Sequence, residues 1–152
     1  HVLTGLATFE LEPPDAAEIA RRRAAVLGLG MPYLVAEHAG TVVGYSYASL
    51  YRTRPAYRYT VEDSVYLHRD WARRGIGTLL LQPLIEGCAR AGARQMIAVI
   101  GDSANHGSIR LHERCGFVRT GFFPSVGFKF GRWVDSVQMQ RALGDGDASV
   151  PA

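Results

Sequence analysis

A glycine-rich run with two adjacent arginines is a candidate anion site at residues 73–78. It reads Arg-Arg-Gly-Ile-Gly-Thr and precedes a stretch with helical apolar spacing, so it falls where a helix would begin. Helix starts favour negative charge, glycines admit a phosphate close to the backbone, and arginines add charge-assisted hydrogen bonds. We therefore predict a phosphate site made by six residues: Arg73, Arg74, Gly75, Ile76, Gly77 and Thr78. The alternative is a tight turn with ordinary surface arginines.

The run differs from the common nucleotide motifs. No Gly-Lys-Ser/Thr follows it, as a Walker loop would require. A dinucleotide fold would need a further glycine and a later acidic strand end. The predicted ligand is therefore phosphorylated but is neither NAD nor ATP.

A second candidate lies on the strand predicted at Thr60–His68. Glu62 and alternate residues after it form a polar face, which should line a cleft. A carboxylate beside a cleft can accept a proton, directly or through a water, so Glu62 is the candidate base. The alternative is a structural or solvated glutamate. Asp63 is the less favoured base, because alternation turns it to the opposite face.

The loop before this strand carries Arg54, Tyr57 and Arg58, within reach of whatever the base deprotonates. The planar guanidinium fork and the phenol hydroxyl could hold a carboxylate or phosphinate. Loop arginines in solvent are the alternative. Phe9 and Trp133 are weaker candidates for apolar walls, because aromatic residues more often belong to a core.

The histidines and cysteines predict no metal site. His106 and His112 lack a zinc spacing, and the His-Glu pair at His112 lacks the second histidine of a metalloprotease helix. Cys88 and Cys115 are far apart in the sequence and form neither a metal knuckle nor a redox pair. We interpret them as two reduced, buried thiols.

The elements that must position these residues follow from periodicity and turn signals. We predict helices at Pro13–Leu27, Arg73–Arg90 and Ser108–Cys115, and strands at Tyr33–Glu37, Thr41–Leu50, Thr60–His68, Gln95–Ile100, Phe117–Phe123 and Phe128–Met139. Strands alternate with helices only in the middle, and both ends read as hairpins, so the fold class is α/β with a mixed sheet. Pro83 should kink the second helix, for a reason that the sequence does not give.

Length and composition limit the possible functions. The 152 residues fit one domain, which we place at residues 1–143, with a flexible tail at 144–152. Hydrophobic residues make up 47% and charged residues 20%, as in a soluble globular domain, and we expect a cytoplasmic protein with no membrane span. The net charge of +3 comes from dispersed arginines, which suits a small polyanionic ligand better than a nucleic acid.

The run at 73–78 resembles the pyrophosphate-binding motif of the GNAT acetyltransferases, although Ala72 stands where the family has Gln or Arg. The resemblance extends to four further segments: Thr60–Leu67, Ala98–Gly101, Ser108–Phe117 and Val126–Asp135. Together they are similar to the phosphinothricin and methionine sulfoximine acetyltransferase branch. The resemblance implies the GNAT fold, a mixed, mostly antiparallel sheet flanked by helices. Another strand and most of a helix usually precede the segment like Leu3–Glu10, so we expect that the N-terminal strand is missing.

The resemblance also implies roles for individual residues. Glu62 falls on the glutamate that serves as the base in the branch, and His112 on the late-helix position that supplies the general acid. The pantetheine arm of acetyl-CoA would meet backbone groups of Val65, Tyr66 and Leu67, and Asn105 lies in the loop that contacts the cofactor. The alternative for His112 is a histidine on the helix surface.

The implied reaction is acetyl transfer from acetyl-CoA to the primary amine of a small, amino-acid-like molecule, in a homodimer. Lys129 lies in the terminal hairpin, where substrate contact and a structural or dimer-interface role are both open. The rival readings are a GNAT enzyme with another amine acceptor and a non-catalytic sensor of acyl-CoA or an amino acid.

Overall fold

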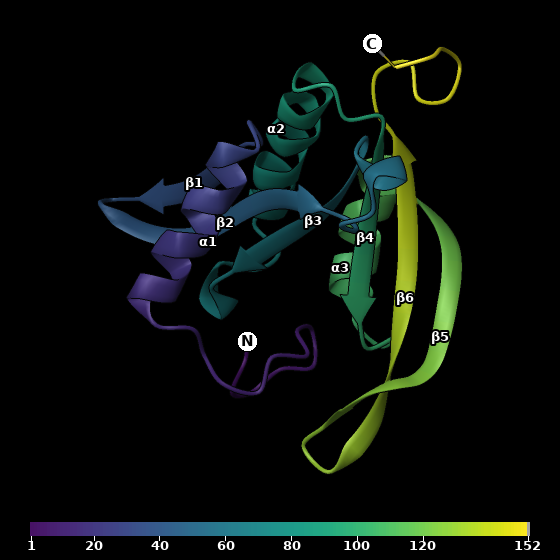
Figure 1. Cartoon of the computed structure of the whole chain (residues 1–152). Helices are drawn as coiled ribbons and strands as arrows, with labels where there is room; N and C mark the ends of the chain where they lie inside the picture. Colours follow the sequence, from purple (N-terminus) through teal and green to yellow (C-terminus); the bar gives the residue numbers. More distant parts are fainter. Residues whose placement is uncertain (152) are drawn as a thin grey trace.

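The computed structural model describes residues 1–151, which form helices and a sheet of strands (Figure 1). The elements in order are α1 (Ala16–Gly28), β1 (Tyr33–His38), β2 (Thr41–Leu50), the 3₁₀ turn η1 (Pro55–Tyr57), β3 (Thr60–Leu67), the 3₁₀ turn η2 (Arg69–Trp71), α2 (Ile76–Arg90), β4 (Gln95–Gly101), α3 (His106–Arg114), β5 (Val118–Lys129) and β6 (Arg132–Ala142). All nine predicted helices and strands are present; β2 has the predicted bounds, and each of the others has at least one shifted end.

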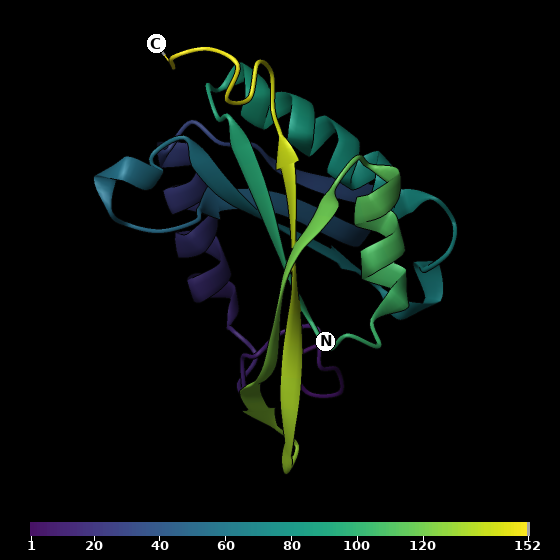
Figure 2. The same cartoon turned by 90° about the vertical axis from the view of Figure 1, so that its right-hand side faces the viewer.

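The strands form one mixed sheet in the order β1-β2-β3-β4-β6-β5. Only β3 and β4 pair in parallel within residues 1–151, and the other neighbours are antiparallel. Figure 2 shows α2 and α3 on one side of the sheet and α1 on the other. The predicted fold class, a mixed and mostly antiparallel sheet flanked by helices, is confirmed.

The parallel pair separates soon after it begins. Its register covers only Thr60↔Gln95, Val61↔Met96 and Glu62↔Ile97, after which β3 and β4 diverge (Figure 1). Within residues 1–151, the edge of β3 beyond Glu62 therefore has no strand partner on that side, which leaves backbone polar groups there without ladder hydrogen bonds. The opening begins at the predicted base.

The first helix begins at a different residue from the one predicted. Helix α1 begins three residues later than expected, because Asp15 is its N-cap and accepts a hydrogen bond from the Glu18 N–H at 2.7 Å.

In α2, Pro83 lies on the exposed face of the helix, where water can satisfy the carbonyl that loses its hydrogen-bond partner. The neighbouring Leu80 carbonyl accepts from the Ser46 hydroxyl at 3.1 Å. The fold therefore accommodates the proline that the sequence left unexplained.

The final hairpin differs from the prediction, which placed a turn between Phe123 and Phe128. Strand β5 instead continues to Lys129, with an irregular register between Phe123 and Gly127. The turn falls at Phe130-Gly131, whose φ values of 51° and 72° give the left-handed conformation of a two-residue hairpin turn. A bulge, rather than a turn, explains the break in the sequence pattern.

The core lies between the sheet and α2. Leu81, Leu84 and Met96 are fully buried there, together with the free thiol of Cys88. Residues 144–151, which we predict as a flexible tail, contact Arg94, whose guanidinium donates to Ser149 Oγ at 3.1 Å. The division into a domain at 1–143 and a tail stays a prediction.

Candidate active site

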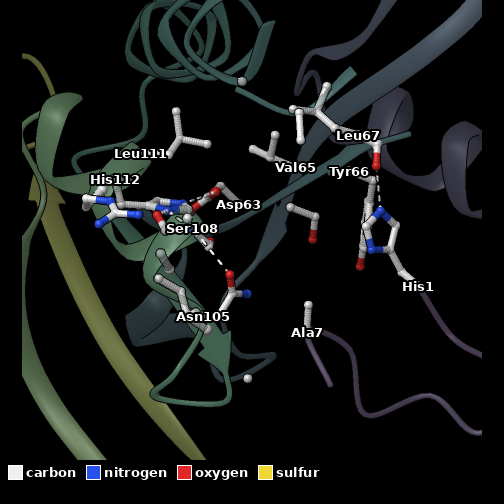
Figure 3. Close-up of a pocket in the computed structure, with 18 of the residues that line it drawn as sticks. His1, Ala7, Asp63, Val65, Tyr66, Leu67, Asn105, Ser108, Leu111 and His112 are labelled. Carbon is white, nitrogen blue, oxygen red and sulfur yellow. Dashed lines mark hydrogen bonds and ion pairs between the residues drawn. The ribbon is translucent and has the colours of Figure 1, made fainter. Parts of the chain in front are cut away.

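A cavity of about 1060 Å³ occupies the opening between β3 and β4 and extends to the start of α2. Figure 3 shows its labelled side chains converging from β3, α3 and the N-terminal segment. Its lining includes ten residues that the sequence predicts for the site: Phe9, Glu62, Val65, Tyr66, Leu67, Arg73, Gly75, Gly77, Thr78 and Asn105. His112, the predicted general acid, also lines it. One cavity therefore joins the candidate base to the candidate anion site.

The start of α2 has the geometry of an anion site. Gly75 is its N-cap with φ 81°, and Arg73 has φ 61°, so the chain enters the helix through left-handed residues. The first N–H groups of a helix have no intrahelical partner and carry the positive end of its dipole. Arg74 does not line the cavity, and its guanidinium lies 4.8 Å from the centre of the Trp71 ring. Ile76, the first residue of α2, is also absent from the lining.

The second glycine of the run permits close packing of α2 on α3. A Cβ at Gly77 would lie 3.0 Å from Leu111 Cδ2, and Leu111 lines the same cavity. A side chain at this position would therefore require the Leu111 side chain to move. Gly77 thus allows close contact between the two helices at the cavity.

Helix α3 brings its own start to the cavity. Asn105 is the N-cap, and its side-chain Oδ1 accepts from the Ser108 N–H at 3.2 Å. This hydrogen bond fixes the Asn105 side chain at the cavity wall (Figure 3). The cofactor contact of Asn105 stays a prediction.

Glu62 is partly buried where β3 and β4 diverge. Burial raises the pKa of its carboxyl, the negative charge of Asp63 raises it further, and Arg52 opposes both. A carboxyl with a raised pKa is a stronger base once it is deprotonated. Arg52, which the sequence reasoning did not select, thus belongs to the electrostatic surroundings of Glu62.

Asp63 and His112 form a buried ion pair in the cavity wall. Their side chains are 1% and 5% exposed, and His112 Nε2 lies 3.0 Å from Asp63 Oδ2 (Figure 3). His112 Nδ1 donates to the Ser108 carbonyl at 2.8 Å. His112 is therefore not the surface histidine considered as an alternative, and both ring nitrogens are engaged. Its role as general acid stays a prediction.

Strand alternation does not remove Asp63 from the cavity. Asp63 lines it together with Glu62, although consecutive residues of a strand point to opposite faces. The opening beside β3 exposes side chains of both faces to one space. No local pattern in the sequence marks this position, because the point of strand separation depends on tertiary packing.

The remaining cavity walls come from β3 and the N-terminal segment. The Leu67 carbonyl accepts from His1 Nε2 at 2.6 Å (Figure 3). Phe9 packs so closely on Gly127 that a Cβ there would lie 2.8 Å from the ring. Lys129, the only lysine of the chain, is buried and donates from Nζ to the Thr8 carbonyl at 2.7 Å. Lys129 thus contacts the N-terminal segment that forms part of the cavity wall.

The predicted substrate loop lies outside the cavity lining. Arg54, Tyr57 and Arg58 are all exposed and do not line it. The Arg58 guanidinium lies 4.5 Å from the centre of the Tyr59 ring. Trp133 is 64% exposed and also lies outside the lining. Substrate contacts of these residues stay predictions.

Two further findings concern metals and membranes. Residues 1–151 contain no group of three His, Cys, Asp or Glu side chains that could hold a metal ion. In the same range, no helix has the length and apolar character needed to cross a membrane.

Comparison with known proteins identifies the family. Residues 5–117 match the acetyltransferase (GNAT) family. The chain belongs to this family and is an N-acetyltransferase, as the resemblance in the sequence predicted.

Individual relatives refine the comparison. The chain is 54% identical to the phosphinothricin N-acetyltransferase of Alcaligenes faecalis, over 99% of this chain and 77% of the relative. It is 46% identical to a methionine sulfoximine and methionine sulfone acetyltransferase of Salmonella typhimurium, over 76% of this chain and 67% of the relative. The predicted branch is confirmed.

Solved structures agree with the sequence relatives. A phosphinothricin acetyltransferase of Sinorhizobium meliloti in complex with acetyl-CoA superimposes with a TM-score of 0.95 at 49% identity, covering 99% of this chain and 82% of the other. YncA of Salmonella typhimurium, also solved with acetyl-CoA, gives a TM-score of 0.94 at 39% identity, over 99% of this chain and 86% of the other.

Proposed function

We propose that this chain transfers the acetyl group of acetyl-CoA to the primary amine of a small, amino-acid-like substrate of the phosphinothricin or methionine sulfoximine type, with Glu62 as general base. The observation that carries the proposal is the single cavity that joins Glu62 to the start of α2. The helix start suits the pyrophosphate of acetyl-CoA. Glu62 then lies at the acceptor end, where the amine must lose a proton.

The proposed reaction is a direct displacement at the thioester. The neutral amine attacks the carbonyl carbon, the new C–N bond forms, the C–S bond breaks, and coenzyme A leaves as a thiolate that takes up a proton. Glu62 accepts the proton that the amine loses, directly or through a water. Because the pKa of Glu62 is raised, the rate should fall as the pH drops through that value and the carboxylate becomes protonated.

An anionic end on the acceptor fits the charges around the cavity. Arg52 acts electrostatically on Glu62, and Arg54 and Arg58 follow it in the same loop. A carboxylate or phosphinate on the substrate could pair with a guanidinium there. Polycationic acceptors would favour acidic surroundings instead.

A paired substitution tests the base. Glu62→Gln keeps the shape of the side chain but cannot accept a proton, so we expect turnover to fall about 100-fold or more near neutral pH. Glu86→Gln, on the exposed face of α2, is the matched control and should keep parental turnover. Release of coenzyme A with a panel of amino-acid amines measures the effect. Full activity of Glu62→Gln would contradict the base assignment, and binding of acetyl-CoA without turnover on any amine would favour a sensor.

We also propose that the chain forms a homodimer through the β5-β6 hairpin. Large apolar side chains on this hairpin are more than half exposed: Val118, Phe122, Phe123, Val126, Phe128 and Trp133. Figure 1 shows the turn end of the hairpin projecting beyond the rest of the sheet. Such a concentration of exposed apolar side chains is characteristic of an interface. A second copy would bury it.

Light scattering after size-exclusion chromatography tests the dimer. The parent should elute with the mass of two chains, and Phe123→Glu should lower that mass toward one chain. Val35→Glu, at a residue 58% exposed on the opposite edge strand β1, is the control. A monomeric parent at micromolar concentration would refute the proposed interface.

A cytoplasmic location completes the proposal. Cys88 and Cys115 are both free and buried, which suits a reducing compartment. Localisation of the tagged protein by cell fractionation would test it.

A further inference from the structure

Asp63 and His112 form a buried ion pair in the wall of the proposed active site, and the reaction proposed above does not account for the burial of these two charges. Removing two charges from water costs several kcal/mol for each ion unless hydrogen bonds and Coulomb attraction offset the loss. Here the residues are 6% and 4% exposed, and Asp63 comes from β3 while His112 comes from α3 (Figure 3). A chain that only needed to pack β3 against α3 could use apolar side chains.

The hydrogen bonds of His112 define where its protons lie. The Ser108 carbonyl can only accept, so Nδ1, at 2.8 Å, carries a proton. Nε2 faces the carboxylate at 3.0 Å, which also accepts. Burial by itself lowers the pKa of His112, but the hydrogen bond and charge of Asp63, with the Ser108 carbonyl, outweigh burial and raise it. These two acceptors therefore favour the doubly protonated form of His112 and raise its pKa.

The pairing engages only one of the two carboxylate oxygens of Asp63. Oδ2 faces His112, whereas Oδ1 is buried and has no hydrogen-bond partner among residues 1–151. Glu62 precedes Asp63 in β3, and both line the cavity. Charges interact more strongly in such a partly dry site than in water. The base therefore shares its cavity wall with a second carboxylate, whose negative charge disfavours ionisation of Glu62.

The charge of Asp63 also acts on both cysteines of the chain. The Cys88 thiol on α2 has its pKa raised to about 12 by burial and by Asp63, so it stays protonated. Burial also raises the pKa of Cys115, with Arg141 opposing and Asp63 adding to the rise. On the Glu62 side, burial and then Asp63 raise the pKa of the carboxyl, and Arg52 lowers it.

We propose that Asp63 is a positioning residue for acetyl transfer: His112 holds its carboxylate in the cavity wall, where its negative charge makes the adjacent Glu62 a stronger base. The inference rests on the proposed function, because it requires Glu62 to be the proton acceptor. A base works best when its pKa approaches the working pH. His112 serves this arrangement by allowing a second carboxylate to be buried beside the first.

The pH dependence of kcat/KM for the amine acceptor tests the inference in the full-length chain. Asp63→Asn keeps the shape and removes the charge, so the acidic limb of the profile should move to lower pH by about half a unit or more, and the plateau should fall by up to about 3-fold per half unit because a weaker base remains. Asp147→Asn, on the exposed C-terminal segment, should change neither. An acidic limb that stays in place in Asp63→Asn would overturn the inference.

The Glu62→Gln variant distinguishes failure of the inference about Asp63 from failure of the proposed function. If Glu62→Gln loses both activity and the acidic limb while Asp63→Asn leaves that limb unmoved, Glu62 is the base and only the inference fails. If Glu62→Gln keeps the parental profile, the base assignment fails and takes the inference with it.

Nitrogen NMR of the parent provides a measurement that does not depend on folding of the variants. The ¹⁵N shifts of His112 should show two protonated ring nitrogens above about pH 6.5, where a free imidazole becomes neutral. Loss of the second His112 proton at the free imidazole value of about 6.5 would overturn the inference.

Discussion

Breaking the buried pair at His112 should destabilise the fold far more than breaking a surface pair on the same helix. His112→Leu roughly preserves volume but leaves Asp63 buried with neither oxygen paired. Removal of one partner from a buried ion pair costs about 3–5 kcal/mol. The Glu113–Arg119 pair has side chains 45% and 58% exposed, so Glu113→Gln should cost less than about 1 kcal/mol.

Urea unfolding measures the loss of stability in each variant from the shift of the transition midpoint, provided that the denaturant slope m is unchanged. The difference between parent and His112→Leu should also depend on pH. The pKa of His112 is raised in the folded chain, so its contribution is fully present below the unfolded value of about 6.5 and is lost as pH rises through the folded value. The deficit of the variant should thus shrink in alkaline solution. Equal, small losses for both variants at every pH would refute the reasoning about the buried pair.

Two further predictions concern the cavity walls. Arg73→Glu should weaken acetyl-CoA binding about 10-fold or more, because it reverses the charge at the start of α2. Arg74→Glu should have a smaller effect, since that guanidinium lies over the Trp71 ring. The thermal shift at a fixed acetyl-CoA concentration measures both effects, and equal effects would contradict the predicted difference. Gly101→Ala should lower the free energy of unfolding by about 1–3 kcal/mol and raise the KM for the acceptor, because the new Cβ would collide with the Leu6 carbonyl and displace the N-terminal segment that lines the cavity. An unchanged KM with lower stability would show that this segment does not shape the acceptor end of the cavity.

The anion site and the order of elements could be predicted from the sequence because their signals are local. The run at 73–78 combines glycines and arginines at a helix start, and the structure gives Gly75 the left-handed conformation that such a turn needs. Apolar positions four residues apart placed Leu80, Leu84 and Cys88 on the buried face of α2. Short-range periodicity fixes which face of a helix is apolar, whatever packs against it.

The position of the last turn required the structure. Irregular spacing around Phe123 to Gly127 looks the same in sequence whether the chain bulges or turns. Pairing of β5 with β6 decided between them, because the register on both sides of the irregularity is maintained by the neighbouring strand. Cross-strand hydrogen bonds are long-range contacts that local composition does not encode.

The sequence determined that Glu62 would be a candidate base, and only the tertiary structure decided what surrounds it. Alternation along β3 predicted separate faces for Glu62 and Asp63, yet β3 and β4 diverge at this point and both side chains reach one cavity. His112 is 49 residues from Asp63 in the chain, and packing of α3 brings its ring to hydrogen-bonding distance. Periodicity describes one element at a time, whereas the charge felt by a base is the sum over all elements that pack around it.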